Sequence, residues 1–433
     1  MSRFSLLRIW ESLGTYQFRS NFKKLALANV VAQILLVLAA PILSRLFRPE
    51  NFGELALYIS ITSIVTSIAT LRFDWLIPNP RSHRIAARLF LAGIILLCLI
   101  TLIFFFVIFK MGDMIIPDQY TSLRNFAPLM ALSVFGIGLH NLYTGWYVRT
   151  SNLSKIAKVK IMQSLGNITI SILLGYMAFT ASGLLFATVI SSWLGISLLI
   201  NGSTEIRDHL RNLKIKQLFN TITHFSRQAI LSTAVSGLNT FSSRAMILLF
   251  ALVYSPSQVG LIIFAHRLIS NPVTVIARGL SKSFWAHTSD LSRIQDYRSL
   301  RRDFLKVTYL LFTVAILLLF ITLLIQPLIV PLFGPDWSEM GIILIMLMPM
   351  VCGATIVSPT NHLVVLGRQG LQLYADILRL VFICLAILAA AVFEWNFVFA
   401  VLAVSCSSLL GHLVLFFIQL REQGKLIYKY DNK

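Results

Sequence analysis

The sequence predicts an all-α integral membrane protein, with twelve transmembrane helices in two six-helix bundles around a central cavity. Of the 433 residues, 57% are apolar and only 12% are charged, and the mean hydropathy is +0.79. An ordinary globular domain carries about 25% charged residues, so this chain has too few polar residues to cover a water-soluble core of its size. Twelve mostly apolar segments of about 20 residues are long enough to cross a bilayer as helices.

The twelve predicted spans follow one another along nearly the whole chain. They lie near residues 25–44, 53–71, 89–109, 127–148, 161–180, 182–200, 228–252, 258–281, 307–331, 340–361, 371–393 and 395–419. Residues 1–24 carry Trp10 and five basic residues but no apolar core of a cleaved signal, so we expect a cytoplasmic interfacial segment there. Residues 420–433 are expected to form a cytoplasmic tail.

The distribution of charge orients these spans. With the N-terminus in the cytoplasm, the predicted inner segments hold 29 of the 37 Lys and Arg residues, and the outer segments hold four. This bias obeys the positive-inside rule and places both termini in the cytoplasm. The net charge of +20 is therefore explained by topology, and we expect no nucleic-acid partner. Anionic phospholipids are the expected partners of the basic loops.

The longest inner loops divide the chain into halves. Residues 201–227 have apolar positions at helical spacing beside basic ones, which predicts an amphipathic linker on the inner surface between bundles 25–200 and 228–419. A Pro-x-x-apolar-Gly turn recurs at Pro49–Gly53 and Pro256–Gly260, an offset of 207 residues. Six spans per half would give both halves one orientation, as in transporters that bind substrate between two repeats.

Four arginines interrupt the predicted spans: Arg244, Arg267, Arg278 and Arg379. Asp376 is the only acid well inside one. An unpaired Arg at the membrane centre costs at least about 2.5 kcal/mol, so it should face water or an anion. Arg267 and Arg278 are about three helical turns apart and would share one face. With Arg244 on the preceding span they could line a cationic cleft suited to phosphate, because a guanidinium offers forked donors.

Structural explanations compete for some of these residues. Arg278 lies near an inner end and could extend its charge to the surface. Asp376 and Arg379, spaced i, i+3, could neutralise each other. No acid lies within one turn of Arg244 or Arg267, and for them we favour a functional role. Of the histidines in or near spans, His266 remains a candidate proton relay.

Several motifs of catalysis and metal binding are missing from the sequence. It contains no P-loop, no H-E-x-x-H and no nucleophile elbow. The four cysteines lie in apolar runs without C-x-x-C spacing, which predicts neither disulfides nor a metal site. We therefore expect a protein that is not an enzyme and that needs no metal or other cofactor.

Four segments resemble one family. Leu71–Pro78 resembles the Leu-Arg-Tyr-Glu/Asp-x-Ala-Ile segment of bacterial polysaccharide flippases, the Wzx-type (O-antigen type) branch of the multidrug/oligosaccharidyl-lipid/polysaccharide exporter superfamily. Pro41–Phe47, Val259–Leu268 and Leu332–Trp337 are similar to other motifs of that family, in the same order. In many relatives an Asp precedes the residue that matches Arg244, whereas this chain has Ser243.

This resemblance implies a transport function. Such a protein moves undecaprenyl-pyrophosphate-linked oligosaccharide repeat units across the bacterial inner membrane by alternating access, for the synthesis of O-antigen, lipopolysaccharide or a related surface polysaccharide. Arg244 and Arg267 are then the expected contacts of the pyrophosphate or of acidic sugars. Arg45, Arg72 and Arg278 are weaker candidates near the mouths of the cavity.

The resemblance also implies an energy source and partners, which the residues leave open. Asp74 and Asp376 are candidates for coupling to H⁺ or Na⁺, although the membrane potential could suffice and Asp74 could simply pair with Arg72. A polysaccharide polymerase and chain-length machinery are expected partners. The alternatives are a cation-coupled drug antiporter of the same superfamily, which should offer carboxylates to its substrate, and a membrane glycan polymerase, which should carry acidic catalytic groups.

Overall fold

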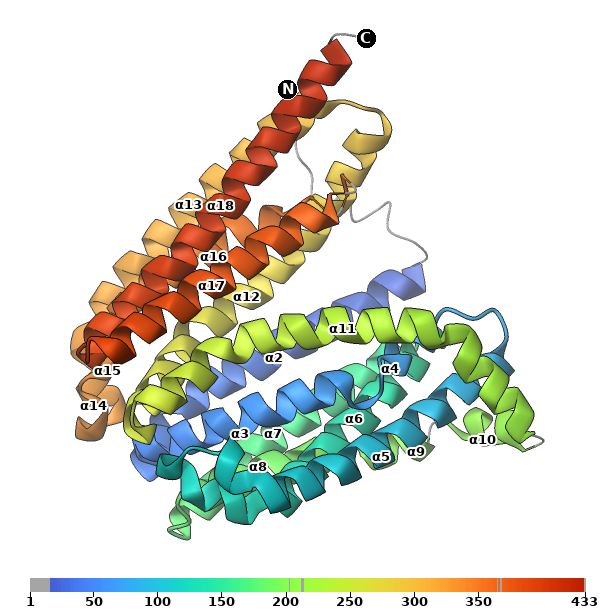
Figure 1. The fold of residues 1–433 in the computed structure, drawn as a ribbon, viewed down its shortest axis with the longest axis horizontal. Helices are drawn as coiled ribbons and strands as arrows, with labels where there is room; N and C mark the ends of the chain where they lie inside the picture. The colour runs from blue at the N-terminus through green and yellow to red at the C-terminus, as the bar shows by residue number, and fades with distance from the viewer. Residues whose placement is uncertain (1–15, 202, 212–213, 364, 367, 432–433) are drawn as a thin grey trace. The chain divides into compact units, whose positions relative to one another are not determined.

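The computed structural model describes residues 16–201, 203–211, 214–363, 365–366 and 368–431, with side chains left out in parts of some helices, chiefly residues 16–26 and part of 271–293. The described chain is helical and contains no β-strand, which confirms the all-α class (Figure 1). Its contacts divide between Gly260 and Leu261 into an N-terminal unit and a C-terminal unit. The domain boundary predicted within residues 201–227 rests on the sequence repeat and not on contacts between residues, so it stays a prediction.

The N-terminal unit contains the first seven predicted spans. Its elements are α2 (Tyr16–Leu46), α3 (Pro49–Ala69), α4 (Phe73–Leu76), α5 (His83–Ile115), η1 (Asp118–Phe126), α6 (Ala127–Arg149), α7 (Leu153–Tyr176), α8 (Ala181–Trp193), α9 (Ile196–Asn201), α10 (Thr204–Leu210) and α11 (Ile215–Val253). Helix α2 packs along α7, α5 along α6 and α11 along α3 (Figure 1).

The C-terminal unit contains the remaining spans. Its elements are α12 (Pro256–Arg293), whose first turn still belongs to the N-terminal unit, α13 (Tyr297–Ile325), η2 (Gln326–Leu328), α14 (Ile329–Phe333), η3 (Pro335–Trp337), α15 (Met340–Met346), α16 (Met348–Val357), η4 (Ser358–Thr360), α17 (Gln369–Val392) and α18 (Phe397–Asp431). Helix α18 packs mainly on α17 and α16.

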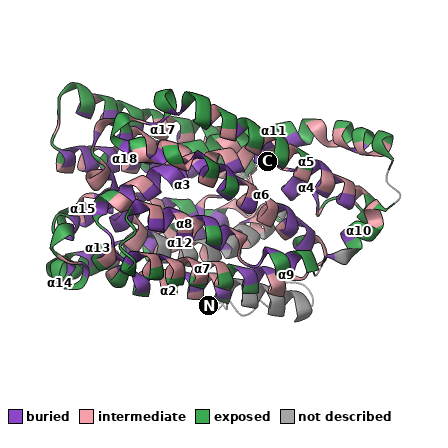
Figure 2. Cartoon of the chain, turned by 90° about the horizontal axis from the view of Figure 1, so that it is seen from below, coloured by how far each residue is buried: buried purple, intermediate pink, exposed green. Residues whose placement is uncertain are grey.

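All twelve predicted spans fall on these helices. Within the described residues, nine helices or helix pairs are long and apolar enough to cross a membrane, and a tenth span is formed if α15 and α16, bent by 45°, are counted as one. Pro349 follows that bend and explains it, because proline lacks the amide donor that continues a helix. Long runs of exposed positions on α11 and α17 are apolar, as a lipid-facing surface requires (Figure 2).

The segment that leads into the seventh span differs from the expected linker. Helix α10 is short, and α11 begins at Ile215 and continues without a break to Val253. Residues 215–227 are therefore the first turns of a long helix. An amphipathic pattern has the same period in a helix that lies on the membrane and in one that continues into it, so the sequence could not separate the two.

The two turns of the sequence repeat contact each other within the N-terminal unit. A Cβ atom added to Gly53 would lie 1.9 Å from the carbonyl oxygen of Pro256, and one added to Gly260 would lie 1.8 Å from that of Pro49. The contact is reciprocal between equivalent residues, as expected when two copies of one motif meet about a two-fold axis. Only glycine fits at either position, which explains why each turn ends in this residue.

Candidate functional site

The two arginines that carry the sequence prediction lie on helices of different units. Arg244 lies on α11 of the N-terminal unit and Arg267 on α12 of the C-terminal unit, and both side chains are half-buried. Among the described residues, neither guanidinium has a hydrogen-bond or ion-pair partner. Ser243 bonds to the carbonyl oxygen of Asn239 at 2.8 Å, so it takes no part in holding Arg244.

The weaker arginine candidates have varied surroundings. Arg45 lies exposed in the last turn of α2. The side chain of Arg278 lies outside the described residues, so the shared face of Arg267 and Arg278 stays a prediction. Arg72 lies in the turn after α3, where it contacts Asp74 and Trp75.

This turn has an unusual backbone. Leu71 and Arg72 have positive φ values of 44° and 57°, which non-glycine residues adopt at a cost. The hydroxyl of Thr70 donates to Asp74 Oδ1 at 2.7 Å, and a nitrogen of Arg72 lies 3.9 Å from Asp74 Oδ2. The Arg72 guanidinium lies 4.5 Å from the ring centroid of Trp75. Asp74, only 6% exposed, therefore has the pairing with Arg72 that the sequence offered as an alternative to ion coupling.

Helix α6 holds the segment that follows. The guanidinium of Arg149 donates to the carbonyl oxygens of Ile77, Pro78, Pro80 and Arg81. A Cβ atom at Gly145 would lie 2.3 Å from the carbonyl oxygen of Asp74, so α6 approaches this turn as closely as a glycine allows. The resemblance motif is thus fixed from one side by a single helix. Burial lowers the pKa of Arg72, and the charge of Asp74 opposes that shift.

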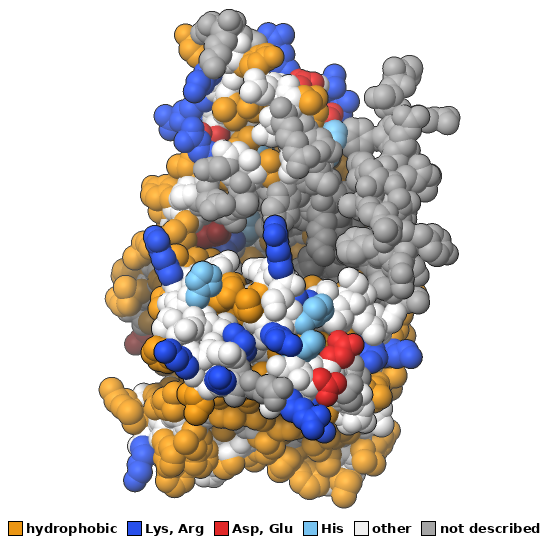
Figure 3. All heavy atoms as spheres, turned by 90° about the vertical axis from the view of Figure 1, so that its right-hand side faces the viewer, with side chains coloured by type: hydrophobic (Ala, Val, Ile, Leu, Met, Phe, Trp, Pro, Cys, Tyr) orange, Lys and Arg blue, Asp and Glu red, His pale blue; other side chains and the backbone are white. Residues whose placement is uncertain are grey.

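Basic and aromatic side chains gather at the end of the N-terminal unit where α10 lies. Figure 3 shows Lys, Arg and His side chains on this face. The rings of His83 and His209 stack with centroids 5.7 Å apart, and Trp146 lies against both. These contacts attach α10 to the ends of α5 and α6. The face corresponds to the basic inner side that the charge distribution predicts.

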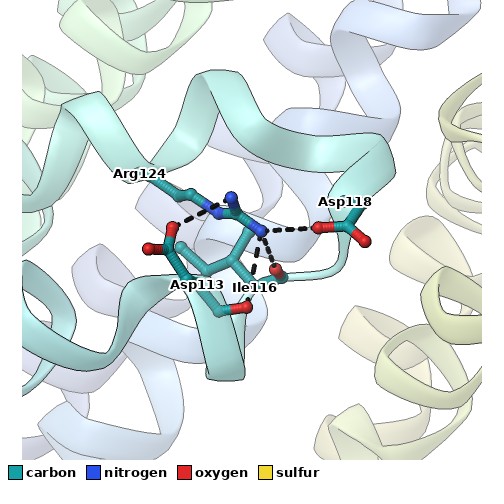
Figure 4. A network of polar contacts seen from close by, with 4 residues as sticks. All are labelled: Asp113, Ile116, Asp118 and Arg124. Carbon is teal, nitrogen blue, oxygen red and sulfur yellow. Dashed lines mark hydrogen bonds and ion pairs between the residues drawn. The ribbon is translucent and has the colours of Figure 1, made fainter.

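A second ionic network lies in the turn between α5 and α6. Arg124 in η1 bonds to Asp113 and Asp118, each at 2.9 Å, and to the carbonyl oxygen of Ile116 at 3.0 Å (Figure 4). Both carboxylates are largely exposed. The network joins the end of α5 to η1, and we assign it a structural role.

Two charged residues within a span of the C-terminal unit, Asp376 and Arg379, pair with each other. Arg379 lies 3.3 Å from Asp376 Oδ1, so the mutual neutralisation that their spacing suggested is present. The same guanidinium lies 3.2 Å from Nε2 of His412 on α18. His412 and Arg379 are 33 residues apart, and no local sequence pattern connects them. His266, the predicted candidate for a proton relay, is half-buried on α12 beside Arg267.

A cavity of about 220 Å³ lies within the C-terminal unit. Its walls are mostly apolar and include hydroxyls from Ser270 and Ser281 on α12 and from Thr355 and Ser358 on α16 and η4; Val273, Ala277, Val351, Ala354 and Pro359 complete the lining. Arg267 precedes Ser270 by one helical turn on α12. Small residues recur on α12 at positions 270, 277 and 281. This spacing is the sequence signal that could have predicted the cavity.

The described residues contain no group of His, Cys, Asp or Glu side chains that could hold a metal ion. Two buried polar groups outside the predicted site lie in the N-terminal unit. Glu54 Oε2 on α3 and the hydroxyl of Tyr120 in η1 have no hydrogen-bond partner among the described residues. Glu54 lies in the first turns of α3, at the edge of the second predicted span.

The fold is shared with known transporters. An inward-facing multidrug resistance MATE family transporter of the MOP superfamily matches with a TM-score of 0.73 at 14% identity, over 93% of this chain and 99% of that one. A lipid II flippase, MurJ, in an inward closed conformation, matches with a TM-score of 0.60 at 13% identity, over 95% and 90%. A MATE protein in complex with MaD3S matches at 0.58 and 14%, over 98% and 99%.

These identities establish the fold alone. No protein among those with curated descriptions matches the sequence significantly. Residues 42–342, however, match a family described as "Polysaccharide biosynthesis protein", and this match covers more than half of the chain. The chain therefore belongs to the polysaccharide biosynthesis protein family, with the fold of membrane transporters of the MOP superfamily.

Proposed function

We propose that this protein moves undecaprenyl-pyrophosphate-linked oligosaccharide repeat units across the bacterial inner membrane, with both termini in the cytoplasm, to supply O-antigen or a related surface polysaccharide. The observation that carries the proposal is the pair of half-buried arginines, Arg244 and Arg267, without a counter-charge among the described residues. A charge in such a place needs an anion or water to offset the cost of burial. A pyrophosphate supplies that anion during transport.

The chemistry of a lipid-linked glycan fits this arrangement. Its polyprenyl tail can remain in the bilayer, whereas its polar, anionic head cannot cross hydrocarbon unaided. A guanidinium keeps its charge and binds phosphate oxygens with two parallel donors. The cavity beside Ser270 offers hydroxyls between apolar walls, which suit the polar edges and apolar faces of a sugar. Transport needs no covalent step, so the protein is not an enzyme.

A cation substrate is less compatible with these residues. Of the acids in the described spans, Asp376 is paired with Arg379, and Glu54 lies near an outer end. A drug/cation antiporter should offer carboxylates to its cargo. Arg45, Arg72 and Arg278 are proposed as secondary contacts of the substrate, and a polymerase with chain-length machinery would receive it on the outer side.

The test compares three variants in cells that depend on this protein for their surface glycan. Arg267→Ala removes the charge, and Arg267→Lys keeps it without the forked geometry. Arg302→Ala is the matched control, because its side chain is 65% exposed and it lies on α13 of the same unit. Loss of a charge-assisted hydrogen bond costs about 1.5–3 kcal/mol, so we expect a loss of glycan of about tenfold or more for Arg267→Ala.

Two measurements are needed for each variant: surface polysaccharide on gels and the amount of protein in the membrane. Arg267→Lys should keep intermediate activity, and Arg302→Ala should match the wild type. Normal glycan in Arg267→Ala at normal protein abundance would refute the assignment. Export of cationic dyes that requires a carboxylate rather than Arg267 would instead favour the antiporter.

A further inference from the structure

Helix α18 carries a buried polar stripe through the C-terminal unit. Ser405, Ser408, His412, Gln419 and Gln423 follow one another at intervals of three, four, seven and four residues, so they share one face of the helix. Each of them is at most 4% exposed. Buried polar groups in an apolar helix are costly unless they are bonded or have a function. His412 is the only titratable member of this stripe.

The hydrogen bonds of His412 define its protonation state. Nδ1 lies 2.8 Å from the carbonyl oxygen of Ser408, and Nε2 lies 3.2 Å from a nitrogen of Arg379. A carbonyl oxygen only accepts and a guanidinium only donates, so Nδ1 carries the hydrogen and Nε2 accepts with its lone pair. The imidazole is therefore neutral in this arrangement, and its one free basic site is occupied by Arg379.

The helices pack closely around this pair. A Cβ atom on Gly411 would lie 2.4 Å from Cβ of Arg379, and one on Gly353 of α16 would lie 3.3 Å from Cβ of His412. A change in the position of Arg379 must therefore alter the packing of α17 against α18. His412 itself is 4% exposed, but Arg379 and Asp376 are 27% and 36% exposed and connect it to the surface of the unit.

The charged groups that face His412 are few. Helix α17 contributes Arg379 and Asp376, whereas α15 and α16 contain no charged residue. The charged residues of α13 lie in its first turns. These turns approach α18 near Gly424, twelve residues beyond His412, because the nearest atom to a Cβ added at Gly424 belongs to Arg301. Among the described residues of the elements packed on α18, the local balance is thus one cation and one anion.

We propose that His412 is a proton-binding site that couples transport to proton movement by passing Arg379 from His412 to Asp376. A proton from water binds the Nε2 lone pair, and the hydrogen bond from Arg379 is lost. Imidazolium and guanidinium then repel each other at this short distance, and Arg379 completes its pairing with Asp376, already 3.3 Å away. When the proton returns to water, the bond between Arg379 and His412 forms again.

The same geometry argues against a sodium site at Asp376. Its carboxylate already has a guanidinium as counter-ion, so no net negative charge remains there to attract a second cation. The identity of the cargo whose transport the proton drives rests on the proposed function. The proton-binding step itself can be tested without any cargo.

The first experiment measures the conformational response to protons alone. A bimane fluorophore is attached to Cys384, which is exposed on α17 five residues after Arg379, with the other three cysteines replaced by Ser. The protein is placed in vesicles of phosphatidylethanolamine and phosphatidylglycerol, and emission is followed between about pH 3.5 and pH 8, because burial and a neighbouring cation both move the protonation of an imidazole to lower pH. We expect one protonation step that is the same in sodium and choline buffers and is absent in His412→Gln.

His362→Gln is the matched control. His362 is also buried in this unit, with Nδ1 2.9 Å from the carbonyl oxygen of Thr360 and Nε2 2.9 Å from the amide nitrogen of Gln423, but its partner there is neutral. The step should persist in this variant. Arg379→Gln, which leaves the imidazole and removes its cationic partner, should abolish it and serves if His412→Gln does not fold. A step that survives in either His412→Gln or Arg379→Gln, or that requires sodium, would overturn the proposal.

The second experiment adds a cargo to the same vesicles. The probe is undecaprenyl pyrophosphate carrying one fluorescent N-acetylglucosamine, and its movement is followed by the access of an external quencher. An imposed pH gradient should change the initial rate by about fivefold or more in the wild type, and His412→Gln should move the probe at a rate independent of the gradient. Vesicles that show the protonation step but never move the probe contradict the proposed function, whereas movement indifferent to the gradient in the wild type contradicts proton coupling.

Discussion

The reciprocal glycine contact makes a quantitative prediction about the repeat. Gly53 and Gly260 each touch the carbonyl oxygen of the proline that begins the other turn. In Gly53→Ala, the new methyl group would start 1.9 Å from the oxygen of Pro256, about 1.1 Å inside the 3.0 Å limit that real Cβ atoms respect. The obstacle is backbone rather than the end of a flexible side chain, so α3 and α12 must move apart at their first turns.

The energetic cost follows from the kind of obstacle. Overpacking in a well-packed interior typically costs about 1–3 kcal/mol, and sometimes more. A backbone contact in both directions belongs at the upper end of that range, and we expect about 3 kcal/mol for either single variant. The two contacts share the same pair of turns, so the double variant Gly53→Ala/Gly260→Ala should cost clearly less than twice that amount, because the helices separate only once.

Thermal unfolding of the detergent-purified protein is the assay. At about 2–4 °C per kcal/mol, a value for domains of 150–250 residues, each single variant should lose at least about 6 °C. Gly370→Ala is the control, because nothing lies within 4 Å of its added Cβ and alanine favours a helix by up to about 1 kcal/mol. A Tm for Gly53→Ala equal to that of Gly370→Ala, or strictly additive losses, would refute the reciprocal contact.

Two further variants test local contacts. Arg149→Ala should lower the free energy of unfolding by about 2–3 kcal/mol, because the carbonyl oxygens of residues 77–81 lose a shared charged donor. Faster hydrogen exchange confined to residues 77–81 would support this prediction, and unchanged exchange would contradict it. Asp296→Ala removes the N-cap of α13 and should cost about 1 kcal/mol at neutral pH. Hydrogen bonds from Ser299 lower the pKa of Asp296 in the folded protein. The stability that the cap contributes is therefore present above the pKa of Asp296 in the unfolded chain, and it is lost as pH falls through its pKa in the folded protein. The Tm difference between Asp296→Ala and the wild type should shrink below about pH 4, and a constant difference would show that the carboxylate does not act as the cap.

The sequence predicted those features that a bilayer imposes locally. A helix that crosses hydrocarbon must be long and apolar, and this requirement is visible in any window of about 20 residues. All twelve predicted spans are helical in the described residues. Of the two helices outside the count of apolar spans, α7 carries three lysines in its first turns, so its polarity is the reason that composition alone does not identify it as a span. Helix α12 lies partly outside the residues whose side chains the structure describes, and the count does not extend to it.

Contacts between distant segments could not be predicted in the same way. The pairing of Asp376 with Arg379 is local and was visible as an i, i+3 spacing, but the bond from Arg379 to His412 depends on how α17 packs on α18. Likewise, the repeat at Pro49 and Pro256 was visible as a pattern, whereas the contact between its copies required the fold. Sequence periodicity reports what one helix needs, and not which partner supplies it.

The half-buried arginines of the described residues fall into two groups when their partners are compared. Arg72 lies near a carboxylate and an aromatic ring, Arg149 donates to four carbonyl oxygens, and Arg379 contacts an acid and an imidazole. Arg244 and Arg267 have no such partner among the described residues. Such a difference within one chain indicates that the last two charges serve something other than folding.

This contrast leads to a prediction of opposite sign for stability and transport. Replacing a buried charge that lacks a partner with an apolar residue of similar length should be neutral or stabilising, by up to about 1–4 kcal/mol. Arg267→Met should therefore unfold at the same temperature as the wild type or higher, while it no longer supports surface glycan. Arg149→Met, which takes a donor from carbonyl oxygens, should unfold at a lower temperature. If Arg267→Met instead destabilised the protein as much as Arg149→Met, then Arg267 would be a structural residue, and its role in binding an anionic substrate would have to be abandoned.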